Sequence, residues 1–102
     1  MGEAMILENT GISQQVLKEI VDLAKTHDLS KVVLFGSRAR GDYGKKSDID
    51  LAAEGKDVAA FAVDVDEQTE TLLQYDIIDL AEIQEELLDN IRREGIVLYE
   101  KV

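Results

Sequence analysis

The spacing of apolar residues changes repeatedly between a helical and an extended period, and this alternation constrains the fold more than any other feature. Helical spacing predicts helices over about 13–28, about 57–72 and from about 83 to 95, with Ser13 and Asp57 as N-caps. Extended runs predict strands over 31–36, 47–53, 75–80 and 96–99. This alternation in one small chain predicts an α/β (α+β) fold, in which helices pack on a small mixed β-sheet.

Two helix ends are predicted in more detail. The helix that starts at Asp57 is expected to carry Leu72 and Leu73 on its apolar stripe. The last helix is expected to have basic residues in its final turn, at 92 and 93, and to end at Gly95 in a left-handed C-cap.

The chain is short and acidic, which excludes several classes of protein. Its 102 residues hold 22 Asp and Glu against 11 Lys and Arg, so the formal net charge is −11, and 45% of the residues are hydrophobic. This length and apolar content predict a single domain over 1–102 with one modest core. Because the net charge repels phosphate backbones and anionic lipid, we expect no direct nucleic-acid binding and no membrane binding.

The absence of Cys excludes a disulfide framework, a thiol nucleophile and a thiolate zinc site, and fits a reducing compartment. The single His27 cannot build a metal cluster. The first residues are acidic, whereas a secretory signal begins with a basic segment, so we expect no such signal, whether the natural chain starts at Met1 or Met5. No apolar run approaches the roughly 18 to 20 residues of a membrane span. We therefore expect a cytoplasmic protein.

The segment 36–50, GSRARGDYGKKSDID, holds most of the residues that can do chemistry. Gly36 ends an apolar strand, and Ser37 can start a short helix whose free N–H groups point at an anion. A glycine there lets phosphate oxygens approach the backbone. Gly41 is followed by Asp42 rather than by Lys and Ser or Thr, which excludes a Walker A loop. The segment therefore predicts a phosphate cradle of another kind.

Asp48 and Asp50 lie two residues apart in a predicted strand. Their carboxylates would leave the same face about 7 Å apart along the chain and could converge on Mg²⁺. The alternative is a solvated strand face, which this spacing on its own favours. Asp64 and Asp66 have the same spacing, but on a helix their side chains diverge by roughly 200°, so we assign them no role.

The combination of Gly36-Ser37, ten further residues and Asp48-Ile49-Asp50 resembles the signature of the DNA polymerase β-like nucleotidyltransferase superfamily. The sequence FGSRARG followed by SDIDL is similar to the motifs of its minimal bacterial and archaeal members. The resemblance covers roughly residues 31–100. It implies a palm-like nucleotidyltransferase fold. It also implies a Mg²⁺-dependent transfer of a nucleoside monophosphate, most simply AMP from ATP, onto a hydroxyl group.

The resemblance also implies which residues act as metal ligands and catalytic groups. Asp48 and Asp50 correspond to the acids that bind two Mg²⁺ ions in the family, and a third carboxylate completes the site. The strand YDIIDL carries two candidates for that carboxylate. Only one of them can meet the metals, because a strand sends the two side chains to opposite faces. We predict Asp76, with Asp79 as the alternative, because the resemblance implies that the first acid of such a strand is the catalytic one.

The same resemblance assigns the nucleotide-binding residues. Gly36 and Ser37 correspond to the turn that holds the β- and γ-phosphates. Four cations lie within nine residues of each other beside the acid pair, and we expect Arg38, Arg40 and Lys45 to help bind a triphosphate. A solvated loop is the competing interpretation of these cations.

In its length and sequence motifs, this chain resembles the antitoxin of a two-gene pair. The companion in such pairs is a HEPN-domain ribonuclease toxin, encoded next door, and a tyrosine hydroxyl of that toxin is modified. The acidic helix at about 57–72 is then a candidate docking face, unless it is simply solvated. A different class of function stays open at this point: a non-catalytic nucleotide-binding or regulatory subunit that binds a helical partner.

Overall fold

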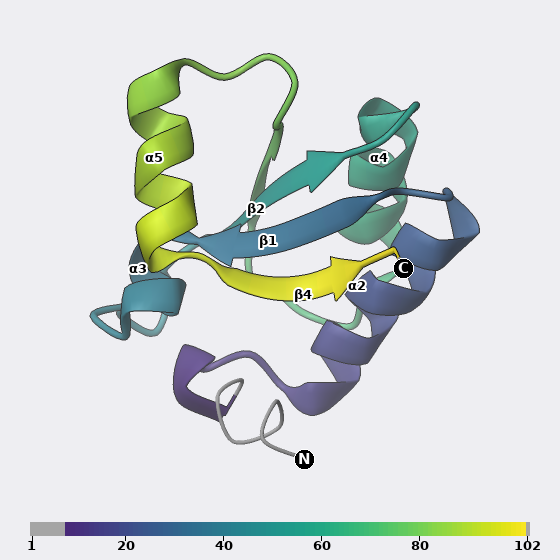
Figure 1. The fold of residues 1–102 in the computed structure, drawn as a ribbon. Helices are drawn as coiled ribbons and strands as arrows, with labels where there is room; N and C mark the ends of the chain where they lie inside the picture. Colours follow the sequence, from purple (N-terminus) through teal and green to yellow (C-terminus); the bar gives the residue numbers. More distant parts are fainter. Residues whose placement is uncertain (1–7, 102) are drawn as a thin grey trace.

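A four-stranded mixed sheet forms the centre of the molecule in the computed structural model, which describes residues 8–101 (Figure 1). The strands are β1 (Lys31–Phe35), β2 (Ile49–Glu54), β3 (Tyr75–Asp79) and β4 (Ile96–Glu100), in the order β3-β2-β1-β4. β1 runs antiparallel to both of its neighbours, and β2 runs parallel to β3. The predicted mixed sheet is confirmed.

Helices cover both faces of this sheet. They are the 3₁₀ helix η1 (Glu8–Thr10) and the α-helices α2 (Gln14–Thr26), α3 (Gly36–Arg40), α4 (Val58–Gln68) and α5 (Glu85–Glu94). Because successive strand side chains point to opposite faces, Val32 and Leu34 join the core beneath α2 and α4. Val33 and Ala52 point the other way and pack under α5 with Ile91.

The predicted N-caps are present, but α4 is shorter than expected. The Ser13 hydroxyl accepts a hydrogen bond from the Val16 amide at 3.1 Å, and Asp57 caps α4 in the same way. α4 ends at Gln68, and the extended backbone of its C-cap, Thr69, leads the chain away. The prediction that Leu72 and Leu73 belong to its stripe is therefore wrong. The chain needs this stretch to reach Tyr75, which aligns with the start of β2.

Gly95 follows α5 as predicted, but its backbone is extended (φ −72°, ψ 152°), so the predicted left-handed C-cap is wrong. Glycine is needed here for space. A Cβ at this position would lie 2.5 Å from Val33 Cγ1 and would overlap the Ile91 carbonyl. The absence of a side chain lets the end of α5 approach β1 closely.

The strand that carries the acid pair begins later than predicted. β2 starts at Ile49, so Ser47 and Asp48 precede it rather than belong to it. The reason is that β1 ends at Phe35, opposite Asp50, where the chain turns into α3. Within residues 8–101, none of the helices is both long enough and apolar enough to cross a membrane.

Candidate active site

A glycine turn places the start of α3 beside the second acid of the pair. Gly36 adopts φ +74°, which favours glycine over residues with a side chain. A Cβ there would overlap the Asp50 carboxylate, so the backbone of the turn lies directly against that group. As predicted, a short helix begins at this turn, and it contains Ser37.

The parallel pairing of β2 with β3 brings a third carboxylate to the same place. Asp50 is aligned with Asp76 in the register of the two strands, and Asp48 lies two residues before Asp50. The Asp50 carboxyl is partly buried, whereas Asp48 and Asp76 are exposed. Burial, followed by the charges of Asp76 and Asp48, raises the pKa of Asp50, and Arg40 partly opposes this rise. The three carboxylates therefore repel each other at one end of the sheet.

Asp79 lies elsewhere. It is aligned with Ala53, toward the other end of the two strands, and its carboxylate accepts a hydrogen bond from the Ala81 amide at 2.9 Å. Asp79 also lines a groove with residues of α4, on the face opposite α5. The structure thus groups Asp76 with the acid pair and leaves Asp79 apart, while the choice of Asp76 as the catalytic group stays a prediction.

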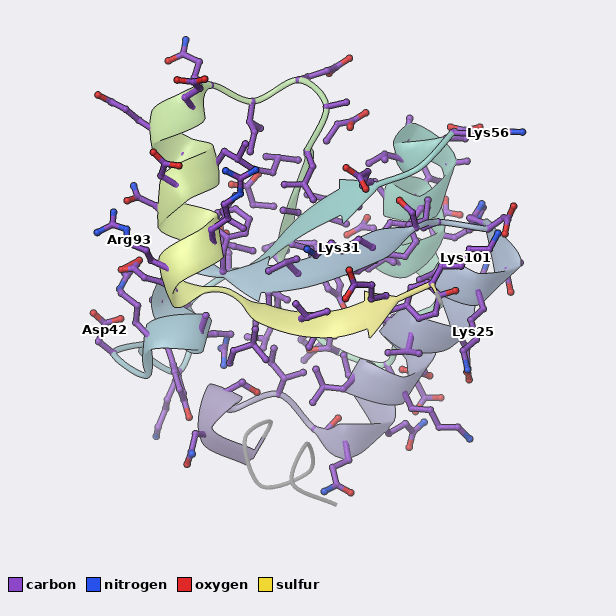
Figure 2. The ribbon with its side chains drawn as sticks, viewed as in Figure 1. Lys25, Lys31, Asp42, Lys56, Arg93 and Lys101 are labelled. Carbon is purple, nitrogen blue, oxygen red and sulfur yellow. The ribbon has the colours of Figure 1, made fainter. Side chains whose placement is uncertain are left out.

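The predicted nucleotide-binding cations differ in accessibility. Arg40 is exposed and forms ion pairs with Asp42 at 3.3 Å and Glu94 at 3.6 Å, and Lys45 is exposed on the following loop. Figure 2 shows Asp42 at the outer side of that loop. Arg38, in contrast, is 2% exposed. Arg40 and Lys45 are therefore available to a phosphate, and Arg38 is turned into the protein.

η1 also contributes to this region, and no pattern in the sequence predicted it. The Thr10 carbonyl accepts a hydrogen bond from Arg38 Nη1 at 2.9 Å, and Gly11 packs against the same guanidinium. A segment this short has no periodicity to detect. The only signal in the sequence is a glycine two residues before the Ser13 N-cap.

The chemistry of the donors fits a divalent cation. Carboxylate oxygens are hard ligands of the kind that Mg²⁺ prefers, and a cation would relieve the repulsion among Asp48, Asp50 and Asp76. Across the described range 8–101, no three acidic or histidine side chains are already arranged as a metal-ligand group. The three carboxylates would have to rotate toward one another to share an ion.

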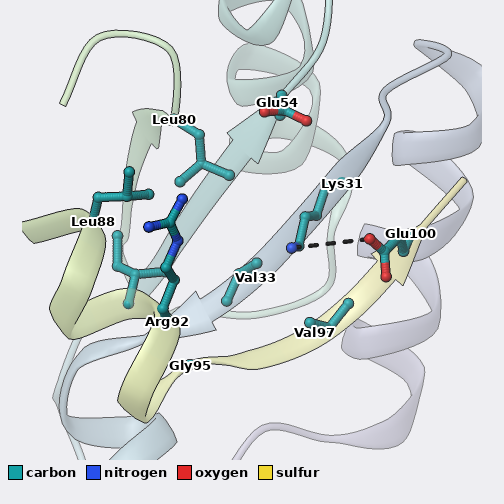
Figure 3. Close-up of a pocket in the computed structure, with 10 residues that line it drawn as sticks. Lys31, Val33, Glu54, Leu80, Leu88, Arg92, Gly95, Val97 and Glu100 are labelled. Atoms are coloured by element: carbon teal, nitrogen blue, oxygen red, sulfur yellow. Dashed lines mark ion pairs between the residues drawn. The ribbon is translucent and has the colours of Figure 1, made fainter. Parts of the chain in front are cut away.

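The acids are not part of the groove of about 370 Å³ that lies between α5 and the open side of β1 and β4 (Figure 3). That groove has an apolar floor that includes Val33, Leu80 and Val97, with Lys31, Glu54, Arg92 and Glu100 around it. Asp48, Asp50 and Asp76 do not line it. The candidate site lies instead at the end of the sheet where β1 ends and where β2 and β3 begin.

Most of the chain matches a known protein family. Residues 18–102 match the family described as Polymerase beta, Nucleotidyltransferase. The chain belongs to this family. The nucleotidyltransferase is also 37% identical to a protein of Methanocaldococcus jannaschii named "Putative protein adenylyltransferase", in an alignment that covers 84% of this chain and 97% of the relative. The resemblance inferred from the motif is confirmed.

Solved structures with the same fold include toxin–antitoxin complexes. A chain of a toxin–antitoxin complex with AMP-PNP superposes on this nucleotidyltransferase with a TM-score of 0.68, at 22% identity, over 83% of this chain and 73% of that chain. A second is from the complex of a tri-AMPylated Shewanella oneidensis HEPN toxin with an MNT antitoxin, with a TM-score of 0.63, 20% identity and coverage of 88% and 74%. At these identities the likeness shows the fold.

Proposed function

We propose that this nucleotidyltransferase transfers AMP from ATP to a hydroxyl group on a partner protein. The observation that carries the proposal is the alignment of Asp76 with Asp50 in the parallel pair, beside the Gly36 turn. This arrangement puts a candidate phosphate cradle and three carboxylates at one end of the sheet. The name of the Methanocaldococcus jannaschii relative, a protein adenylyltransferase, supports AMP as the transferred group.

In this proposal the chain's own residues bind and orient the nucleotide. The backbone at Gly36 and Ser37 receives the β- and γ-phosphates, and Arg40 and Lys45 supply positive charge beside them. The oxygen of the acceptor hydroxyl attacks the α-phosphorus, its proton passes to the Asp76 carboxylate, and pyrophosphate leaves. β3 is an edge strand, so an acceptor can reach Asp76 from the open side of the sheet.

We infer that Asp48, Asp50 and Asp76 would hold two Mg²⁺ ions. When bound, such ions stabilise charge on the attacking and leaving oxygens together. Arg40 has to exchange its ion pairs with Asp42 and Glu94 for the phosphates, which is feasible because exposed ion pairs of this kind contribute little to stability.

The acceptor that we propose is a tyrosine of a HEPN-domain toxin encoded next to this protein, which would make the protein an antitoxin. The support comes from the solved complexes, one of which pairs an MNT antitoxin with a tri-AMPylated HEPN toxin. A net charge of −11 also suits docking onto a basic RNA-cutting protein.

A transfer assay with ATP labelled at the α-phosphate tests the proposal. The protein, Mg²⁺ and the product of the adjacent gene are mixed, and label is followed onto the partner. Label is expected with α-labelled ATP and not with γ-labelled ATP, because AMP rather than phosphate is transferred. Mass spectrometry then locates the added AMP, and replacing the modified tyrosine by Phe should abolish it.

Two variants complete this assay. Asp48→Asn is expected to lower transfer by about a hundredfold or more, because it removes a carboxylate charge from the site. Asp22→Asn makes the same change at an exposed position of α2 and serves as the matched control. A tight complex that forms without any label would contradict the proposal and favour a non-catalytic binding subunit.

A further inference from the structure

Arg38 is a buried cation held by backbone oxygens and an aromatic ring. Its Nη1 donates to the Thr10 carbonyl at 2.9 Å, and its Nε donates to the Ser47 carbonyl at 3.1 Å. The guanidinium carbon lies 4.8 Å from the centre of the Tyr43 ring. Among the side chains of residues 9–101, no carboxylate forms an ion pair with it. These contacts offset part of the cost of burying the charge.

The two hydrogen bonds join segments that are far apart in the sequence. Thr10 ends η1, whereas Ser47 lies in the loop that follows α3 and directly precedes Asp48. The loop is closed on itself near that point, since the Gly44 amide donates to the Ser47 hydroxyl at 2.8 Å and the Ser47 amide donates to the Gly44 carbonyl at 3.2 Å. Arg38 therefore anchors the end of a compact turn.

The turn after η1 is shaped around this guanidinium. Gly11 has φ +71°, and a Cβ there would lie 2.7 Å from Arg38 Nη1 and 2.5 Å from Tyr43 Cε2. Only a residue without a side chain fits at this distance. Gly11 thus leaves the space that the buried Arg38 guanidinium and the Tyr43 ring occupy.

We propose that Arg38 is a positioning residue that fixes Asp48 relative to the phosphate turn. Arg38 and the Gly36-Ser37 turn belong to the same short helix, so α3 carries both the candidate phosphate cradle and the anchor for the acid that follows Ser47. This inference rests on the proposed function and changes one part of it. Arg38 acts through Ser47 and Asp48 rather than on the triphosphate.

Arginine is required for this role because its donors are arranged in a rigid fork. The fork reaches two carbonyls from different segments while its flat face covers Tyr43. A lysine keeps the charge, but its single ammonium on a flexible stem cannot reproduce this geometry. Arg38→Lys therefore separates the geometry from the charge.

The test compares Arg38→Lys with Arg92→Lys, the same change at an exposed position of α5. Amide hydrogen exchange is followed by NMR at Gly44 and Ser47, with the amides of α2 as an internal reference for global stability. Mn²⁺ binding is measured without nucleotide, and ATP binding by calorimetry. In Arg38→Lys we expect exchange at Gly44 and Ser47 to be about tenfold faster, and Mn²⁺ affinity to be about tenfold weaker. Arg92→Lys should match the wild type.

Other outcomes would overturn the inference. Wild-type exchange and Mn²⁺ affinity in Arg38→Lys, together with weaker ATP binding, would show that Arg38 contacts the phosphates directly. If Arg38→Lys does not fold, Gly11→Ala displaces the guanidinium from the other side and should also accelerate exchange at Gly44 and Ser47. Unchanged exchange in that variant counts against the proposal. Mn²⁺ binding by the wild type tests the proposed function separately, because the exchange measurement needs no metal.

Discussion

Asp50 is the residue at which the demands of the site and of stability conflict most clearly. Burial and the carboxylates of Asp76 and Asp48 raise its pKa above the ordinary value of 3.8. The folded protein therefore binds this proton more tightly than the unfolded chain does. The loss of folding free energy caused by ionised Asp50 is therefore absent below the ordinary pKa, grows as pH rises, and is fully present above the raised pKa.

Asp50→Asn is accordingly expected to be more stable than the wild type at neutral pH in the absence of divalent metal, by about a few degrees in Tm. The difference should shrink as pH falls through the raised pKa of Asp50 and vanish below the ordinary pKa of 3.8, because the carboxyl is then protonated in both the folded and the unfolded protein. Thermal unfolding in EDTA across this range measures it, with Asp66→Asn as a control for the loss of one negative charge. A variant that is less stable at neutral pH would contradict the prediction.

At the scale of the elements, the end of α4 shows how a local pattern can extend a helix too far. Leu72 and Leu73 continue the apolar spacing of the helix, yet the chain leaves the helix after Gln68. Leu72 is 100% exposed, whereas its neighbour Leu73 packs against the main core. The two leucines therefore allow an exposed and a partly buried side chain of the same type to be compared at neighbouring positions.

We expect Leu73→Ala to lower the free energy of unfolding by about 1 to 2 kcal/mol, because a partly buried side chain is lost. Leu72→Ala should change it by less than about 0.5 kcal/mol, as is usual for an exposed position. Urea denaturation of the two variants measures the difference. Equal losses would mean that both leucines pack, as they would if α4 continued past Gln68.

At the scale of the whole molecule, the parallel register of β2 and β3 decides which acids meet. A shift of one residue would turn Asp76 to the other face of the sheet. In the observed register Asp76 lies with Asp50, and Asp79 lies with Ala53. The candidate site therefore depends on the pairing of two strands that are separated by a helix in the sequence.

Asp76→Asn is expected to lower transfer at saturating ATP and Mg²⁺ by about a hundredfold or more, while Asp79→Asn should retain most of the activity. The two variants differ by three positions in one strand, so each serves as the other's control. The labelled-AMP transfer assay measures both. Loss of transfer in Asp79→Asn, with activity kept in Asp76→Asn, would show that the third carboxylate had been assigned to the wrong residue.

The order of helices and strands, the caps at Ser13 and Asp57, and the glycine-serine turn with its acid pair all followed from the sequence by itself. These features are local, because each depends only on residues that are close together in the sequence. Examples are the spacing of apolar residues, a capping oxygen and a glycine before a serine. The motif also predicted the family, because its residue types and spacing lie within one continuous segment.

Only the tertiary structure decided the place of Asp76, the burial of Arg38 and the extended backbone at Gly95. The first depends on strand register, the second on contact with Thr10, and the third on how closely α5 approaches Val33. Each joins residues that are distant in the chain, and a local pattern carries no information about such a contact. A cation next to a phosphate motif can bind the ligand or support the loop, and only its packing distinguishes the two roles.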